Sequence, residues 1–153
     1  MKLLSRQNGQ FEFRLARRER ELVVALLGHY PLLPTGYHPP GTEVVCPDPE
    51  GAQMLDELLV EHKAAARQAV QHLLKEKLRP REDLHGWGWS LTEPDIDLLI
   101  EVFNEVRVGA WHQLGCPADL DAIALRDDSR RGALLWAMEV SGAFVSFFLE
   151  LME

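Results

Sequence analysis

The sequence predicts a mainly α-helical single domain of 153 residues, in which an amino-terminal β-hairpin precedes a bundle of about four helices with a buried carboxy-terminal helix. Two patterns predict this class. Long stretches place apolar residues three and four positions apart, which is the repeat of one helix face. The first 15 residues instead alternate apolar and polar side chains around a turn dipeptide, as a hairpin does.

The hairpin is expected over residues 1–15. Its turn is Asn8-Gly9, a dipeptide that tolerates the positive φ angles of a type I′ turn. Phe11, Phe13 and Leu15 share one face of the second strand. Because a lone hairpin is marginal in water, we expect this apolar face to pack on the helices.

A first helix and a long loop are expected next. The helix should cover residues 16–29, and Pro31 should end it. Residues 31–47 hold five prolines and two glycines, so they predict an irregular connection. Long loops often carry function, so Tyr37 and His38 are candidate binding residues. The alternative is that this loop has no binding role and is packed by its own apolar side chains. The apolar face of the helix is expected at Leu22, Ala25, Leu26 and His29.

The second helix should start at Asp48-Pro49, an N-cap acid followed by proline in the first turn, and run to about residue 78. We expect it to pack against the last helix through Ala65, Ala66 and Ala69, which would allow close approach. His62 is expected as a hydrogen-bonded core histidine rather than a metal ligand. The apolar seam of this helix is Leu55, Leu59, His62, Ala66, Ala69 and Leu73.

Residues 81–90 are expected to form a loop with two tryptophans, Trp87 and Trp89. Exposed rings would anchor an interface, and buried rings would cap helix ends. A third helix should begin at Thr92 as N-cap and end before Gly115, where φ is often positive. Its seam is Ile96, Leu99, Phe103, Val106 and Ala110.

The last helix, residues 129–152, is apolar nearly all round and is therefore predicted to be the central helix. Its length approaches that of a membrane span, but Glu139 in its middle favours a buried soluble helix over a tail anchor. A buried carboxylate needs a partner. We therefore expect Glu139 to pair with Arg107, assisted by Asn104, and these three residues form a candidate binding site; the alternative is that each reaches the surface separately.

The charge distribution bears on partners. The formal net charge is −8, which argues against nucleic acid. Residues 1–20 carry +4 and the remaining 133 residues carry −12, an asymmetry that allows a homodimer. Cys46 and Cys116 are isolated, as reduced cytoplasmic thiols are, and no apolar signal core follows Met1, so a cytoplasmic location is expected.

Catalytic motifs are absent from the sequence. It contains no Gly-x-Ser-x-Gly elbow, phosphate loop or dinucleotide fingerprint, and therefore predicts no catalytic residue and no cofactor. The only Glu-x-x-His spacing is Glu82 with His85, within the tryptophan loop, so no metal site is predicted.

The order of elements resembles a small bacterial family of helical proteins of unknown function, common in actinobacteria and often encoded near the Clp adaptor gene. The resemblance lies in Leu91-Thr-Glu-Pro94, in Phe103-Asn-Glu-Val-Arg-Val-Gly109 with Leu114-Gly115, and in the aromatic-rich 134–149 segment. Residues 31–47 and 81–90 do not share it. It implies a helical fold and a link to regulated proteolysis, and no activity.

Together these features predict a non-enzymatic cytoplasmic protein-interaction or regulatory module. The alternative is a helical bundle that binds a small molecule or a metal at a polar core site around Arg107, Asn104 and Glu139.

Overall fold

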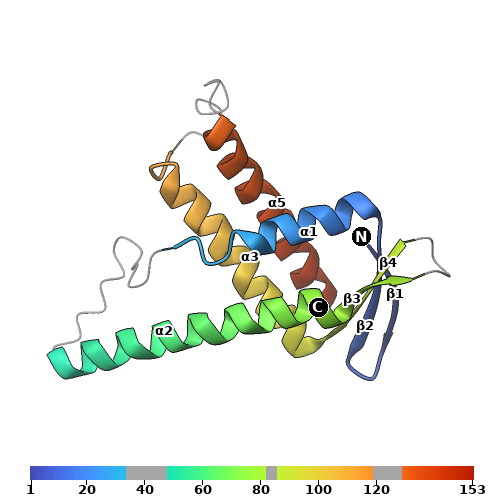
Figure 1. Cartoon of the computed structure of the whole chain (residues 1–153), viewed down its shortest axis with the longest axis horizontal. Helices are drawn as coiled ribbons and strands as arrows, with labels where there is room; N and C mark the ends of the chain where they lie inside the picture. The colour runs from blue at the N-terminus through green and yellow to red at the C-terminus, as the bar shows by residue number, and fades with distance from the viewer. Residues whose placement is uncertain (34–47, 82–85, 119–128) are drawn as a thin grey trace.

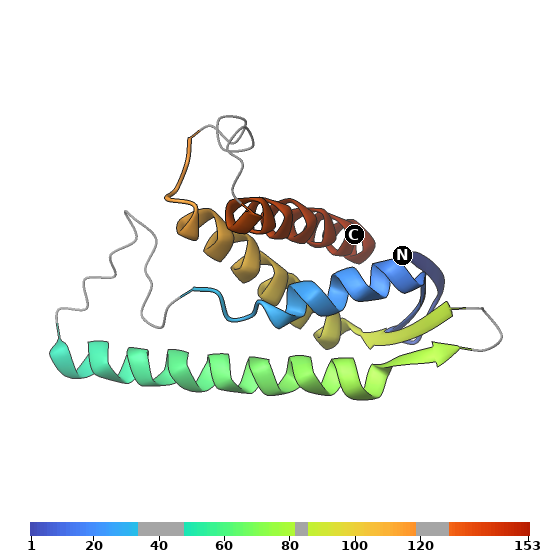
Figure 2. The same cartoon turned by 45° about the horizontal axis from the view of Figure 1, so that its top comes forward.

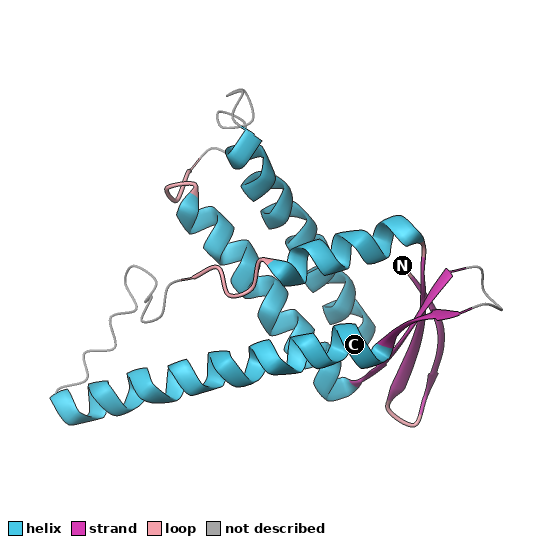
Figure 3. Ribbon diagram, in the orientation of Figure 1, coloured by secondary structure: helices cyan, strands magenta, loops and turns pink. Residues whose placement is uncertain are grey.

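The computed structural model describes residues 1–33, 48–81, 86–118 and 129–153, with the backbone alone at 79–81. Helices dominate the described residues, so the predicted mainly α class is confirmed, and a small antiparallel sheet lies at one end of them (Figure 3). The elements in chain order are β1 (Lys2–Gln7), β2 (Gln10–Leu15), α1 (Arg17–Gly28), α2 (Pro49–His72), the π-helical turn η1 (Leu73–Lys77), β3 (Leu78–Arg81), β4 (Gly86–Thr92), α3 (Glu93–Gln113) and α5 (Ser129–Met152).

The predicted hairpin is present, and its turn residues Asn8 and Gly9 have φ angles of 53° and 73°. The expectation of a hairpin alone is wrong, because the sheet has four strands in the order β1-β2-β4-β3. Part of the predicted 81–90 loop is β4, which pairs with β2. Strand β3 lies at the sheet edge, where the missing N–H of Pro80 is tolerated.

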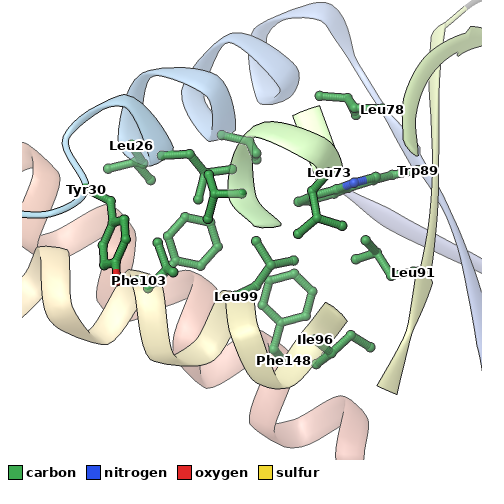
Figure 4. Close-up of a cluster of buried hydrophobic side chains, with 14 of the residues drawn as sticks. Leu26, Tyr30, Leu73, Leu78, Trp89, Leu91, Ile96, Leu99, Phe103 and Phe148 are labelled. Carbon is green, nitrogen blue, oxygen red and sulfur yellow. The ribbon is translucent and has the colours of Figure 1, made fainter. Parts of the chain in front are cut away.

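One face of this sheet forms a wall of the core. Phe11 lies opposite Leu91 and Phe13 opposite Trp89 in the β2–β4 register, and all four side chains are fully buried. Aromatic and aliphatic cross-strand pairs of this kind stabilise a sheet. Figure 4 shows Trp89 and Leu91 facing side chains of the helices within one apolar cluster. The hairpin therefore packs on the helices, as predicted.

The central helix is α3, and not the carboxy-terminal helix as predicted. Its whole predicted seam is buried, and Figure 2 shows it lying between α2 and α5. The bounds of α5 agree with the predicted 129–152, but Leu149 is 50% exposed. The reason is that α5 packs mainly on α3, with Phe148 also reaching Phe13 of the sheet at 6.2 Å between ring centroids. No other described element covers the outer face of α5.

The packing of α2 also differs from the prediction. Its cap is as expected, since the Asp48 carboxylate accepts a hydrogen bond from the Glu50 N–H at 3.2 Å. However, α2 packs on α3 rather than on α5, and it does so through Ala66 and Val70. His62 is exposed rather than in the core, because it meets α3 at the exposed Glu101 carboxylate, 3.4 Å from its Nδ1. Toward its amino terminus α2 diverges from α3 (Figure 1).

The buried face of α1 is rotated from the expected one. Ala25 and His29 are exposed, and the buried residues of the segment are Val23, Leu26, Leu27 and Tyr30. A shift of one residue turns a helix face by about 100°. Val23 and Leu27 make the neighbouring face of the helix apolar as well, so the sequence is compatible with either face. Contact with α3 and the sheet buries the face that carries the bulkier side chains.

Candidate functional site

The amino-terminal half of α2 projects from the molecule. Figures 1 and 2 show it running past the ends of the other described elements. Large apolar side chains remain uncovered there: Met54 is 63% exposed, Leu58 52% and Val60 49%. Isolated exposed apolar residues are common, but a cluster on one helix of a small protein marks an interaction surface.

Two rows of apolar side chains on this half of α2 form a stripe that continues the core-facing side of the same helix. Leu55 and Leu59 lie at helical spacing from Ala66, which is buried against the body. Met54 and Leu58 form the neighbouring row, one turn apart. We call Met54, Leu55, Leu58 and Leu59 the α2 stripe. It is the part of an amphipathic helix face that extends beyond the core.

The α2 stripe is bordered by acidic side chains. Residues 48–61 contain five carboxylates and no lysine or arginine. Glu50, Glu57 and Glu61 share one face, at spacings of seven and four, and all three are exposed. His62 lies one turn after Leu58 and continues the stripe toward α3, where its Nδ1 lies 3.4 Å from Glu101 Oε1.

The two cations of α2 lie beyond Leu59, on the edge of the stripe away from the acidic row. The Lys63 ammonium donates a hydrogen bond to the Leu33 carbonyl oxygen at 3.3 Å. Arg67 lines a hollow of about 290 Å³ with Pro31, Val60 and Lys63. The exposed helix is therefore segregated into an apolar stripe, an acidic outer flank and a basic edge turned toward the end of α1.

The structure brings together only part of the predicted polar site. Arg107 donates a hydrogen bond to Asn104 Oδ1 at 2.8 Å, but both side chains are exposed. Glu139 is also exposed, and within the described part of the chain no ion pair joins it to Arg107. The predicted buried pair is therefore wrong. The stem of Arg107 crosses α5 at Gly142 and carries its guanidinium out to solvent, as long cationic side chains commonly do.

Arg107 and Glu139 nevertheless line the same groove. It lies between α3 and α5 and has a volume of about 840 Å³. Trp111 and Met138 supply apolar walls, and Gly142 keeps its floor low. The groove is open to solvent and is lined by one cation and one carboxylate. It therefore suits a ligand that carries a negative and a positive group better than an apolar ligand, which would need an enclosed pocket.

A clamp holds the chain as it leaves α1. The Glu105 carboxylate accepts hydrogen bonds from the N–H of Leu32 at 3.1 Å and of Leu33 at 2.7 Å. Gly109 lets this segment approach α3, because a Cβ there would lie 2.7 Å from Leu32 Cβ. Burial, together with Glu105 and Glu101, raises the pKa of Tyr30 to about 12. The clamp places Leu33 where its carbonyl oxygen receives Lys63.

The two tryptophans of β4 are not exposed interface anchors. Trp89 is fully buried, and Trp87 is half-buried beneath the Arg20 guanidinium, which lies 3.9 Å from the ring centroid. A cation above an indole face is stabilising. The other two predicted site residues, Tyr37 and His38, lie outside the described residues, as do Cys46, Glu82 and His85.

Two further properties of the described residues bear on function. Among the described residues, no three His, Cys, Asp or Glu side chains gather as metal ligands would. One described helix, α5, is long and apolar enough by length and composition to cross a membrane, and 22% of its most apolar window is buried.

Comparisons with protein-family models, with curated proteins and with solved structures find no match. The resemblance to the actinobacterial family therefore stays a prediction.

Proposed function

We propose that this chain is a non-enzymatic helical module that binds another protein, and that the α2 stripe is its binding surface. The exposure of Met54 and Leu58 on a projecting helix carries the proposal. Burying apolar surface yields about 25 cal/mol per Å², so covering such side chains favours association. Helices that present apolar residues at i, i+3 and i+4, as Leu55, Leu58 and Leu59 do, are recognised by grooves or by other helices.

The dimensions of the stripe support a partner of helical size. Residues 49–62 span about 21 Å at the usual rise per residue. This length accommodates about four turns of a second helix, which is an interface at the small end of the specific range. We therefore expect a transient complex rather than an obligate one. The cytoplasmic location and the link to regulated proteolysis remain predictions.

Site-specific photo-crosslinking in the native cells tests this proposal. A benzophenone amino acid replaces Leu58 in one variant and Leu149 in another, since the two leucines are 52% and 50% exposed. We expect a discrete protein adduct from position 58 and none from position 149. Equal adducts from both positions, or none from position 58, would refute the α2 stripe as the binding surface.

A second candidate function is the binding of a small zwitterionic molecule in the α3–α5 groove. The specific observation is that Arg107 and Glu139 line this groove without an ion pair between them. A ligand carboxylate and ammonium would satisfy the two groups. A thermal-shift screen of free amino acids tests it: an increase in Tm that Arg107→Gln removes supports binding, and no increase at millimolar ligand contradicts it.

A further inference from the structure

We infer that the partner of the α2 stripe is an amphipathic helix whose apolar face is flanked by lysine and arginine. This inference rests on the proposed function and specifies the chemistry of the partner. The stripe alone would accept any apolar helix face. The charges around it are what select among partners, because electrostatic complementarity supplies specificity and association rate.

The outer border of the stripe is a continuous acidic row. Glu57 and Glu61 are one turn apart, and Glu50 lies two turns before Glu57. Each flanks Met54 or Leu58 on the side that faces away from α3. Exposed carboxylates at these positions are placed as the e and g residues of paired helices are, which contact the flanks of the partner helix.

The inner border is acidic where the stripe reaches α3. Glu101 of α3 is held beside the stripe by His62 at 3.4 Å, and Asp97 lies one turn before Glu101 on the same exposed face. A helix laid along the stripe therefore meets carboxylates on its outer edge, and again on its inner edge where the stripe reaches α3. Both edges favour a cationic partner.

The nearest cations do not neutralise these borders. Lys63 lies one turn after Leu59 and donates to the Leu33 carbonyl oxygen, and Arg67 lines the hollow beside Pro31; both lie away from the row of Glu50, Glu57 and Glu61. Gln53 donates to Glu57 at 2.9 Å, which orients that carboxylate without changing its charge. The acidic character of the stripe borders is therefore available to a partner.

The same charges disfavour a second copy of this chain as the partner. An isologous pair brings the same patch of both copies together. In an antiparallel pairing about the stripe, the Glu57 and Glu61 row of one copy would meet the same row of the other. Like charges at contact distance oppose that pairing, so the predicted homodimer is not expected through this surface.

Binding of two designed peptides to the full chain tests the inference. One is an 18-residue helix with leucine at the apolar positions and lysine elsewhere, and the other has glutamate in place of every lysine. Fluorescence anisotropy of labelled peptide measures affinity. The variants are Leu58→Asp for the stripe and Glu57→Lys with Glu61→Lys for its border. The controls are Leu149→Asp and Glu150→Lys with Glu153→Lys, which change equally exposed positions on the carboxy-terminal segment.

We expect the lysine peptide to bind at least tenfold more tightly than the glutamate peptide. Leu58→Asp should weaken binding tenfold or more, and the double charge reversal about fivefold, with smaller effects as salt is raised. The control variants should bind as the parent does. Circular dichroism establishes that each variant is folded, which the exposure of the changed residues makes possible.

Three results would overturn the inference. They are equal binding of the two peptides, equal losses in the α2 and control variants, and self-association of the unliganded chain that Leu58→Asp abolishes. Any of these can occur while position 58 still crosslinks to a protein in cells, in which case the proposed function stands and only the basic partner is wrong. Loss of that crosslink would contradict both the proposed function and the basic partner.

Discussion

Replacing Gly109 with alanine tests how tightly the segment after α1 is seated on α3. The added Cβ would lie 2.7 Å from Leu32 Cβ and 3.2 Å from the Leu32 carbonyl carbon. Leu32 cannot retreat freely, because Glu105 holds its N–H and that of Leu33. Overpacking of this kind costs about 1–3 kcal/mol, whereas alanine in a helix interior gains about 1 kcal/mol over glycine. We expect a net loss of about 1 kcal/mol.

Gly142→Ala is the matched control. Gly142 lies in the interior of α5, and its added Cβ would meet only Arg107 Cδ at 3.4 Å, a flexible side chain. The higher helix propensity of alanine should outweigh this mild contact, so the variant should be more stable than the parent by up to about 1 kcal/mol. Urea unfolding of both variants measures the difference. If Gly109→Ala is as stable as Gly142→Ala, the clamp at Leu32 is wrong.

Three further predictions follow from burial and charge. Phe103→Ala should lower the free energy of unfolding by about 3–5 kcal/mol, and Leu149→Ala should lower it by less than about 1 kcal/mol, because α3 and not α5 is the central helix. Urea melts in which Leu149→Ala is the more destabilising variant would contradict the fold. Burial raises the pKa of Asp95, but hydrogen bonds from Lys77 and Thr92 outweigh it and lower that pKa. The stability that Asp95 contributes is therefore present above its ordinary pKa and is lost as pH falls through the lowered one. Asp95→Asn should destabilise the chain at pH 7 by about 1 kcal/mol, and the difference from the parent should shrink in acid, as urea melts at several pH values would show. In a Tyr37→Phe variant, absorbance titration should show Tyr30 ionising at about 12, and Glu105→Gln should lower that value. Stability from Tyr30 is then present below the ordinary tyrosine pKa and is lost as pH rises from about 10 toward 12. Ionisation near 10 in the folded protein would contradict the burial of Tyr30.

Local signals in the sequence predicted the turns and helix ends well. Asn8-Gly9, the Asp48 cap and the Thr92 cap each act through neighbouring backbone groups, so a few residues suffice to identify them. Gly115 likewise ends α3 with a φ of 88°. The seam of α3 was predicted because its repeat is regular over about four turns.

Strand β4, which was not predicted, has a strand signal in its sequence. Trp87, Trp89 and Leu91 alternate with smaller residues, which is the period of a strand. The glycines on either side of Trp87 suggested a loop instead. Pairing with β2 favours the strand, because Phe11 and Phe13 lie opposite Leu91 and Trp89 on one buried face of the sheet.

Tertiary arrangement explains the remaining errors. An apolar helix such as α5 does not reveal how many neighbours cover it, so its sequence predicted a central position that α3 occupies. The spacing of Asn104 and Arg107 predicted that they share a helix face, where a hydrogen bond joins them, but the sequence did not show that Glu139 would face solvent on another helix. The seam of α2 was apolar in sequence from Leu55 to Leu73, and only the fold shows that its first half extends beyond the core.

Amide hydrogen exchange of the full chain, with and without the leucine–lysine peptide, tests the central claim most directly. Alone, the amides of residues 50–62 should exchange faster than those of α3, because few contacts hold this half of α2 to the body. With the peptide, protection should rise in residues 50–62 and leave the α3–α5 groove unchanged. Protection that appears at Arg107 and Glu139 instead, with no change in residues 50–62, would show that the α2 stripe is not the binding surface.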